Sequence, residues 1–121
     1  MKRNNKLRRS PDNGLFFCNT ADFIHDNYRR PITLEGVAER VGISPRQLQR
    51  IFREKAEMTF SQYVESYRLQ CIREELVRSS KTLEQIALEN GFATSNYLHY
   101  VFKKAYGVTP MQYRRYKECI I

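Results

Sequence analysis

Two copies of one sequence pattern occupy residues 34–63 and 83–113 of this 121-residue chain. The first copy begins LEGVAERVGISPRQLQRIF, and the second begins LEQIALENGFATSNYLHYVF. From Leu34 to Gly42 the offset between the copies is 49 residues, and from Leu48 to Tyr63 it is 50, so the second copy has one extra residue in its turn. A repeat of this period is typical of stacked supersecondary units, but two copies are too few for a solenoid. The chain is therefore expected to contain two similar small lobes.

Each copy has the pattern of two short helices joined by a tight turn. Thr33 and Ser44 are residue types that cap helix N-termini, and Pro45 suits the first helical position because its missing N–H would have no partner there. Gly42, between the two helices, can adopt a left-handed backbone conformation at little cost. The second copy repeats this order from Thr82 onward. The pattern predicts a helix-turn-helix in each copy.

The remaining sequence completes an all-α prediction, because no segment has the pattern of a strand. A first helix is expected from Leu15 or Asn19 to Tyr28. The segment from Phe60 to Arg78 contains no Gly or Pro and predicts one helix, about 28 Å long at 1.5 Å per residue. The polar start of the chain ends in the turn-favouring Pro-Asp-Asn-Gly. Four parts are predicted: a flexible basic arm over 1–14, a first lobe over 15–59, a connecting helix over 60–80 and a second lobe over 81–121.

The helix that follows Ser44 carries the strongest functional signal. With 3.6 residues per turn, Leu48, Ile51 and Phe52 form one apolar stripe. The opposite face contains no acid and consists of Arg46, Gln49, Arg50 and Arg53. Arginine paired with guanine and glutamine paired with adenine read base edges in the major groove. The face therefore predicts DNA recognition, and the alternative interpretation is a solvated, charged face of an ordinary helix.

The corresponding helix of the second copy has a different outer face. It presents Asn96, His99, Tyr100 and Lys103, which are mostly neutral hydrogen-bonding groups. This helix is expected to bind DNA more weakly or to read bases differently. His99 is equally well interpreted as an ordinary surface histidine, and no partner at ligand spacing supports a metal site.

Charge and hydropathy exclude a membrane span but do not by themselves establish DNA binding. The net charge is +8, from 21 basic and 13 acidic side chains, and five of the basic residues lie among the first nine residues. An isolated basic tail is weak evidence, because such tails also bind membranes or serve in targeting. No stretch approaches the roughly 18 apolar residues of a membrane span, and no signal peptide is recognisable. No membrane partner is therefore expected.

The cysteines and histidines do not suggest catalysis. Cys18, Cys71 and Cys119 are odd in number and far apart, without a CxxC pair, so reduced thiols in a cytoplasmic protein are expected; a redox sensor or metal site is the alternative. His25 and His99 lie in different lobes. Paired carboxylates, nucleophile–base constellations and glycine-rich phosphate loops are absent from the sequence. We expect no metal, no cofactor and no enzymatic activity.

From about Asn19 to Lys117 the chain resembles the DNA-binding region of the AraC/XylS family of bacterial transcription regulators, in particular its short single-domain members. The motifs that carry the resemblance are LEGVAERVGISPRQLQRIF in the first half, and LEQIALENGF followed by VFKKAYGVTPMQYRR in the second. The resemblance implies an all-α fold of two lobes and about seven helices. It also implies a cytoplasmic monomer that binds an asymmetric site, with two recognition helices in successive major grooves.

The resemblance also implies which residues contact DNA. Many relatives have arginine at the position of Tyr100, so a guanine contact there is in doubt. The base-reading residues it implies are Arg46, Gln49 and Arg50 in the first lobe and Ser95, Asn96 and Tyr100 in the second. Phosphate contacts require donors on the flanks. For them we predict Arg53, His99, Lys103, Lys104, Arg114 and Arg115, together with backbone N–H groups near Thr59 and Thr109.

The sequence thus predicts a sequence-specific, double-stranded DNA-binding transcription regulator. Activation through RNA polymerase is implied by the resemblance alone, and a repressing or architectural DNA-binding protein is the alternative. A protein-sequestering module is disfavoured, because interface cores are usually depleted in charge. If the chain is complete, as its initial Met and basic arm favour, regulation is expected to act through its abundance. If it is a fragment, a sensory domain belongs to the whole protein.

Overall fold

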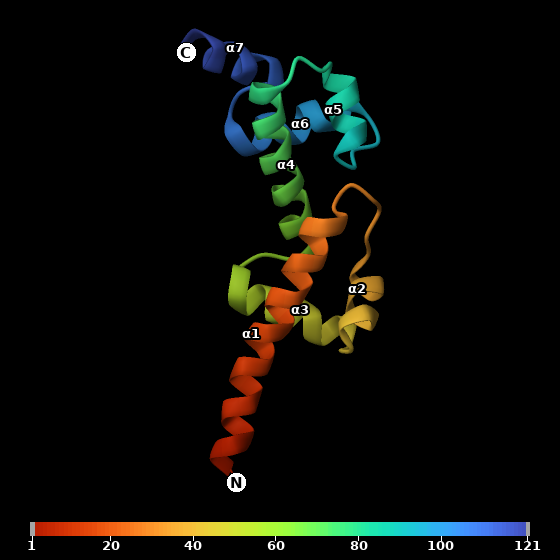
Figure 1. The fold of residues 1–121 in the computed structure, drawn as a ribbon, viewed down its shortest axis with the longest axis vertical. Helices are drawn as coiled ribbons and strands as arrows, with labels where there is room; N and C mark the ends of the chain where they lie inside the picture. The colour runs from red at the N-terminus through yellow and green to blue at the C-terminus, as the bar shows by residue number, and fades with distance from the viewer. Residues whose placement is uncertain (1, 121) are drawn as a thin grey trace. The chain divides into compact units, whose positions relative to one another are not determined.

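The computed structural model describes residues 2–120, and within them the side chains of residues 13–117. The described residues form helices and short connections, without a strand, in the order shown in Figure 1. The helices are α1 (Lys2–Asn27), α2 (Leu34–Val41), α3 (Pro45–Ala56), α4 (Phe60–Arg78), α5 (Leu83–Glu89), α6 (Ser95–Tyr106) and α7 (Pro110–Ile120). The predicted all-α fold of about seven helices is confirmed, and the predicted Phe60–Arg78 helix is found with the same bounds.

The chain divides into two compact units, Met1–Glu65 and Ser66–Ile121, and the boundary lies inside α4. The first turns of α4 contribute Phe60 and Val64 to the core of the first unit. Its later turns contribute Leu69, Ile72 and Leu76 to the core of the second. The sequence placed α4 between the lobes as a connector, whereas the structure uses it as a core helix of both units.

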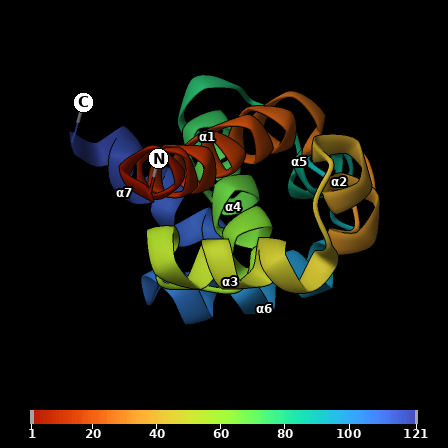
Figure 2. The same cartoon turned by 90° about the horizontal axis from the view of Figure 1, so that it is seen from below.

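The core of the first unit is built around the ring of Phe52. This ring is fully buried, and its centroid lies 5.1 Å from that of Phe17, 5.6 Å from Phe60 and 5.2 Å from Tyr63, each edge-on. Such aromatic pairs contribute about 0.5–1.5 kcal/mol each beyond the area they bury. In Figure 2, α2 leads through a short turn into α3. The same cluster includes Ile24 from α1, Val37 and Ala38 from α2, and Leu48 from α3.

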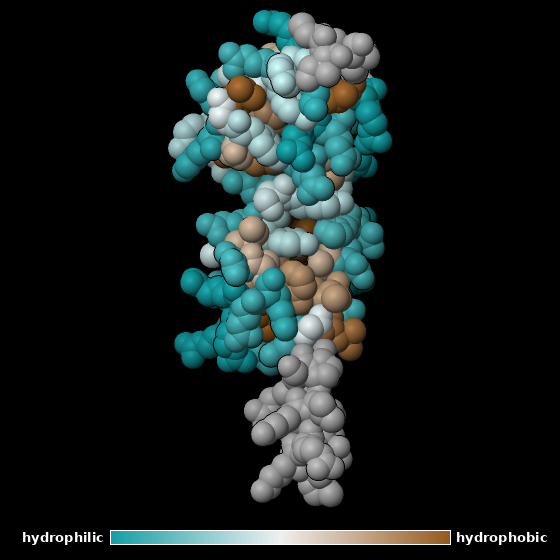
Figure 3. Space-filling model, turned by 90° about the vertical axis from the view of Figure 1, so that its left-hand side faces the viewer, coloured by the Kyte–Doolittle hydropathy of each residue, from teal (hydrophilic) through white to brown (hydrophobic). Residues whose placement is uncertain are grey.

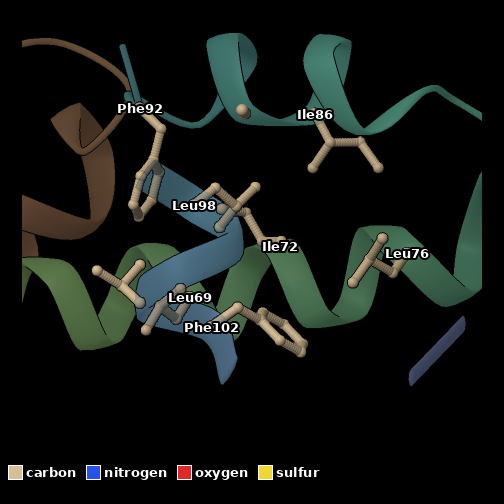
Figure 4. Packing of buried hydrophobic residues seen from close by; sticks show 9 residues of the cluster. Leu69, Ile72, Leu76, Ile86, Phe92, Leu98 and Phe102 are labelled. Carbon is tan, nitrogen blue, oxygen red and sulfur yellow. The ribbon is translucent and has the colours of Figure 1, made fainter. Parts of the chain in front are cut away.

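The second unit has an equivalent core, which Figure 4 shows from close by. Phe102 of α6 takes the place of Phe52, and the rings of Tyr106 and Tyr113 lie edge-on to it at centroid distances of 4.7 and 5.9 Å. Around it pack Leu69, Ile72 and Leu76 of α4, Ile86 and Ala87 of α5, Phe92, and Leu98 and Val101 of α6. Each unit therefore fixes the helix after its turn with one phenylalanine at the same repeat position.

The first helix begins earlier than the sequence predicts. The structure has α1 starting at Lys2, so the predicted start at Leu15 or Asn19 is wrong, and Pro11 to Gly14 do not form a turn that ends the arm. Turn chemistry is a local preference that helix formation can override. The side chains of the first twelve residues lie outside the described part, and a DNA-contacting basic arm there stays a prediction.

The turns are held by the caps that the sequence predicts. The hydroxyls of Thr33 and Ser44 each accept a hydrogen bond from the backbone N–H three residues later, at 3.0 and 3.1 Å. Gly42 has a φ of +87°, in the left-handed region that favours glycine. In the second copy, Thr82 and Thr94 cap α5 and α6 in the same way, both at 3.1 Å. These caps fix where α2, α3, α5 and α6 begin.

Substitution of Gly42 tests the turn of the first unit. A Cβ at this position meets no atom within 4 Å, so only the backbone conformation opposes a side chain. We expect Gly42→Ala to lower the free energy of unfolding by about 1–2 kcal/mol. Gly42→Asn is the matched control, because asparagine tolerates this conformation better. Urea denaturation followed by circular dichroism measures both variants, and equal stability of wild type and Gly42→Ala would contradict the assignment.

Candidate nucleic-acid interface

Helix α3 separates an apolar face from a cationic one. Its apolar residues Leu48, Ile51 and Phe52 are fully buried in the first unit. The predicted base-reading residues Arg46, Gln49 and Arg50 are all exposed on the other side of the helix, as is Arg53. Among the described residues, none of these three guanidinium groups is paired with a carboxylate. The predicted division of faces is confirmed, and base reading by the outer face stays a prediction.

Helix α6 is oriented in the same way but carries less charge. Leu98, Val101 and Phe102 are buried, whereas Asn96, His99 and Lys103 are exposed and Ser95 is half-buried. Tyr100 points outward with 60% of its surface exposed. The ammonium group of Lys104 lies 5.9 Å from the centroid of the Tyr100 ring, within the range of a cation–π contact. The outer face of α6 thus offers hydrogen-bonding groups and one aromatic ring.

Two predicted phosphate donors of the first unit lie together. Arg53 and Thr59, with Glu57, Met58 and Gln62, line a surface hollow of about 370 Å³ at the start of α4. There the Thr59 N–H donates to Gln62 Oε1 at 2.9 Å, and the Gln62 N–H donates to Thr59 Oγ1 at 3.1 Å. This reciprocal cap uses two of the helix-terminal N–H groups and leaves those of the intervening residues to face a phosphate. Thr109 and Gln112 form the same pair at the start of α7.

Arg114 has a structural role that the sequence did not suggest. Its Nε donates to the Leu76 carbonyl at 2.8 Å, and its Nη2 donates to the Ser79 carbonyl at 3.1 Å. The last carbonyls of a helix lack partners within the helix, so the guanidinium group caps the C-terminal end of α4. Arg114 lies 50 residues after the buried Val64, which is its equivalent in the first copy. A charged residue at the position of a buried valine was the sequence signal that could have indicated a structural role for Arg114. Arg115 beside it is exposed, as a phosphate donor must be.

A polar network that the sequence analysis missed fixes α5 of the second unit. Lys81 Nζ contacts Glu89 Oε1 at 2.7 Å and Glu75 Oε2 at 3.0 Å. Hydrogen bonds to Glu89 and then Glu75 raise the pKa of Lys81 above its ordinary value. The fully buried Asn90 donates to Glu75 Oε1 at 3.2 Å and to the Ile86 carbonyl at 2.8 Å. The network joins the end of α4 to both ends of α5 and thereby positions the second helix-turn-helix.

Known proteins share this architecture. A family model described as a helix-turn-helix domain matches residues 37–116. The chain is 34% identical to the multiple antibiotic resistance protein MarA of Escherichia coli K12, over 77% of this chain and 73% of that protein. It is 33% identical to the melibiose operon regulatory protein of the same organism, over 77% of this chain and 31% of that protein.

A solved structure has a similar fold. The crystal structure of an AraC-type DNA-binding-domain transcriptional regulator from Chromobacterium violaceum superimposes with a TM-score of 0.82 and 26% identity, covering 84% of this chain and 91% of that one. The curated relatives differ in length: the chain spans 36% and 31% of two regulators that it matches, but 73% of MarA.

Membrane-spanning helices and clusters of metal-ligating side chains are both absent from the described residues. No helix among them is both long enough and apolar enough to cross a lipid bilayer. Within the same residues, no three His, Cys, Asp or Glu side chains come together as metal ligands.

Arg114 and Arg115 form a matched pair for testing the cap on α4. Arg114→Ala removes two hydrogen bonds to helix-terminal carbonyls and is expected to lower the free energy of unfolding by about 1–3 kcal/mol. Arg115→Ala changes an exposed side chain and is expected to stay within about 0.5 kcal/mol of wild type. Chemical denaturation measures both. Equal effects of the two substitutions would show that Arg114 does not stabilise the second unit.

Proposed function

The chain belongs to the AraC/XylS family of helix-turn-helix transcription regulators, and we propose that it reads a specific double-stranded DNA sequence through both of its units. The outer face of α3 is the observation that carries this proposal. Arg46, Gln49 and Arg50 project from a helix whose other side is locked in the core. Guanidinium and carboxamide groups fixed in this way can donate paired hydrogen bonds to guanine and adenine edges.

The second unit contributes a weaker reading helix. Asn96 and Tyr100 supply an amide and a hydroxyl group at the positions where α3 has the guanidinium groups of Arg46 and Arg50, and Ser95 adds a second hydroxyl group. Tyr100 can contact a thymine methyl or a sugar with its ring, but it cannot make the bidentate guanine contact of an arginine. His99, Lys103 and Lys104 are exposed nearby and are proposed to bind phosphate. Because α3 and α6 present different side chains, the DNA site that they read together is asymmetric, and a monomer can bind it.

The continuity of α4 supports the use of two adjacent grooves. This helix runs from one unit into the other without a break, and its 19 residues correspond to about 28 Å at 1.5 Å per residue. Successive major-groove faces on one side of B-DNA are about 34 Å apart. We infer that α3 and α6 occupy successive major grooves, with a modest bend of the DNA where the two lengths do not match. Such a bend costs a few kcal/mol.

We further propose that the bound protein activates transcription by contacting RNA polymerase. The basis is membership of a family of transcription regulators; the site residues themselves account only for DNA binding. Transcription in vitro with purified polymerase, on a promoter that carries the selected site, separates the alternatives. A higher transcript yield supports activation, whereas repression, or bending without any effect on transcription, favours the repressor or architectural protein.

Selection of bound duplexes from a random library tests base reading. We expect an asymmetric site with two short boxes about one helical turn apart. On that site Arg50→Ala is expected to lower affinity by about 1–3 kcal/mol and to relax preference at one base pair. Arg78→Ala is the matched control, because Arg78 is an exposed arginine of α4 that pairs with Glu74 at 3.7 Å. Unchanged specific affinity of Arg50→Ala would remove α3 as the reading helix.

The salt dependence of binding tests the phosphate contacts. Each neutralised phosphate adds about 0.9 to the slope of log affinity against log salt concentration, and we expect a net slope between about −4 and −8. Lys104→Ala is expected to weaken specific and nonspecific binding alike and to reduce the slope by about 0.9. Fluorescence anisotropy at several salt concentrations measures the slope. A slope near zero on the selected site would contradict the electrostatic part of the proposal.

A further inference from the structure

The second unit contains a groove whose lining includes none of the predicted base-reading or phosphate-contacting side chains. It has a volume of about 610 Å³ and lies between α4 and α7, lined by Arg73, Val108, Gln112, Tyr113, Tyr116 and Lys117. This volume is within the range of about 300–1,000 Å³ that small-molecule sites occupy. The lining is mainly apolar, and Val108 and Tyr116 leave 38% and 62% of their surfaces exposed. On the face seen in Figure 3, isolated hydrophobic side chains of this unit stand among hydrophilic ones.

The two cations of the groove are held against aromatic rings. The Arg73 guanidinium lies 5.0 Å from the Tyr106 ring centroid, and the Lys117 ammonium lies 5.7 Å from that of Tyr113. Among the described residues, neither cation is paired with a carboxylate. A guanidinium group stacked on a ring keeps its in-plane N–H donors for an anion. Burial raises the pKa of Tyr106, although Arg73 acts in the opposite direction.

We propose that this groove binds a small amphiphilic carboxylate. Its aromatic or aliphatic part lies against Val108, Tyr113 and Tyr116, and its carboxylate pairs with Arg73 and Lys117. Charge complementarity carries the choice of an anion, because the lining residues that the structure describes include two cations and no acid. The volume of about 610 Å³ favours a small molecule over a peptide helix, which needs a longer groove.

The groove is connected to the second reading helix through two rings. Tyr106 and Tyr113, which contact its cations, both pack edge-on against Phe102 of α6. A ligand that orders these tyrosines therefore acts on the residue that anchors α6. This consequence rests on the proposed function, since it requires that α6 contact DNA. Linkage then makes the affinity for ligand and the affinity for DNA depend on each other.

Titration of the ¹⁵N-labelled chain with 2-naphthoate tests the site without DNA. We expect saturable amide shifts at residues 108–117 and around Arg73. The neutral isostere 2-naphthamide and the variant Arg73→Gln are each expected to bind about five-fold more weakly or worse. Arg78→Gln, which removes a charge from the same helix outside the groove, is expected to bind like wild type. A well-dispersed spectrum of Arg73→Gln confirms that the variant is folded.

Three outcomes would overturn the site: no saturable shift, shifts confined to residues 13–65, or equal affinity for naphthoate and naphthamide. The comparison of the two ligands uses the wild-type protein and stands even if Arg73→Gln fails to fold. Anisotropy with the selected duplex, with and without 2-naphthoate, tests the coupling separately. Unchanged DNA affinity in the presence of 2-naphthoate would contradict the coupling but not the ligand site. Absence of specific DNA binding would contradict the proposed function, and the ligand site would again be unaffected.

Discussion

The burial of one phenylalanine in each unit is the interaction on which the arrangement of the reading helices depends. Phe52 and Phe102 occupy equivalent repeat positions, are fully buried, and have aromatic rings edge-on to them. The rings around Phe52 come from α1 and α4, whereas those around Phe102 come from α7 and from the last turn of α6 itself. A ring held on several sides fixes both the rotation of its helix and its depth in the core. The residues on the opposite side of the helix are then exposed at a defined angle. The outer faces of α3 and α6 are thus a consequence of core packing.

The two units reach this common arrangement by different means. The first contains Val64 in its core where the second has Arg114, whose guanidinium group caps the end of α4. The first has Val41 where the second buries Asn90 against Glu75. Because buried polar groups are costly unless they are hydrogen-bonded, the second unit depends more on hydrogen-bond geometry and less on apolar contact. The packing of the second unit is therefore more sensitive to changes in the side chains that form these hydrogen bonds.

The sequence predicted those features for which local preference and packing agree. Thr33, Gly42 and Ser44 favour their observed conformations in isolation, and the apolar stripe of α3 needs only a helical period. The start of α1 was missed because the preferences around Pro11 disagree with the observed helix. The capping role of Arg114 was missed because its acceptor at Leu76 lies 38 residues earlier, and charge alone does not identify a distant helix end. Which exposed basic side chains contact phosphate depends on the geometry of the DNA, and these contacts stay predictions.

The charge on α3 is explained better by a ligand than by stability. Arg46 and Arg50 are separated by four residues, and like charges at that spacing destabilise a helix by a few tenths of a kcal/mol. No carboxylate among the described residues forms an ion pair with either side chain, whereas DNA phosphates would. The outer face of α6 lacks such a cluster, and we propose that it gains less from DNA. Two linked DNA-binding units bind far more tightly than either alone, so a change confined to the weaker unit would alter the whole affinity. The proposed ligand groove is lined by Tyr113, which packs on Phe102, so a ligand there would act on the unit to which we assign the smaller binding energy.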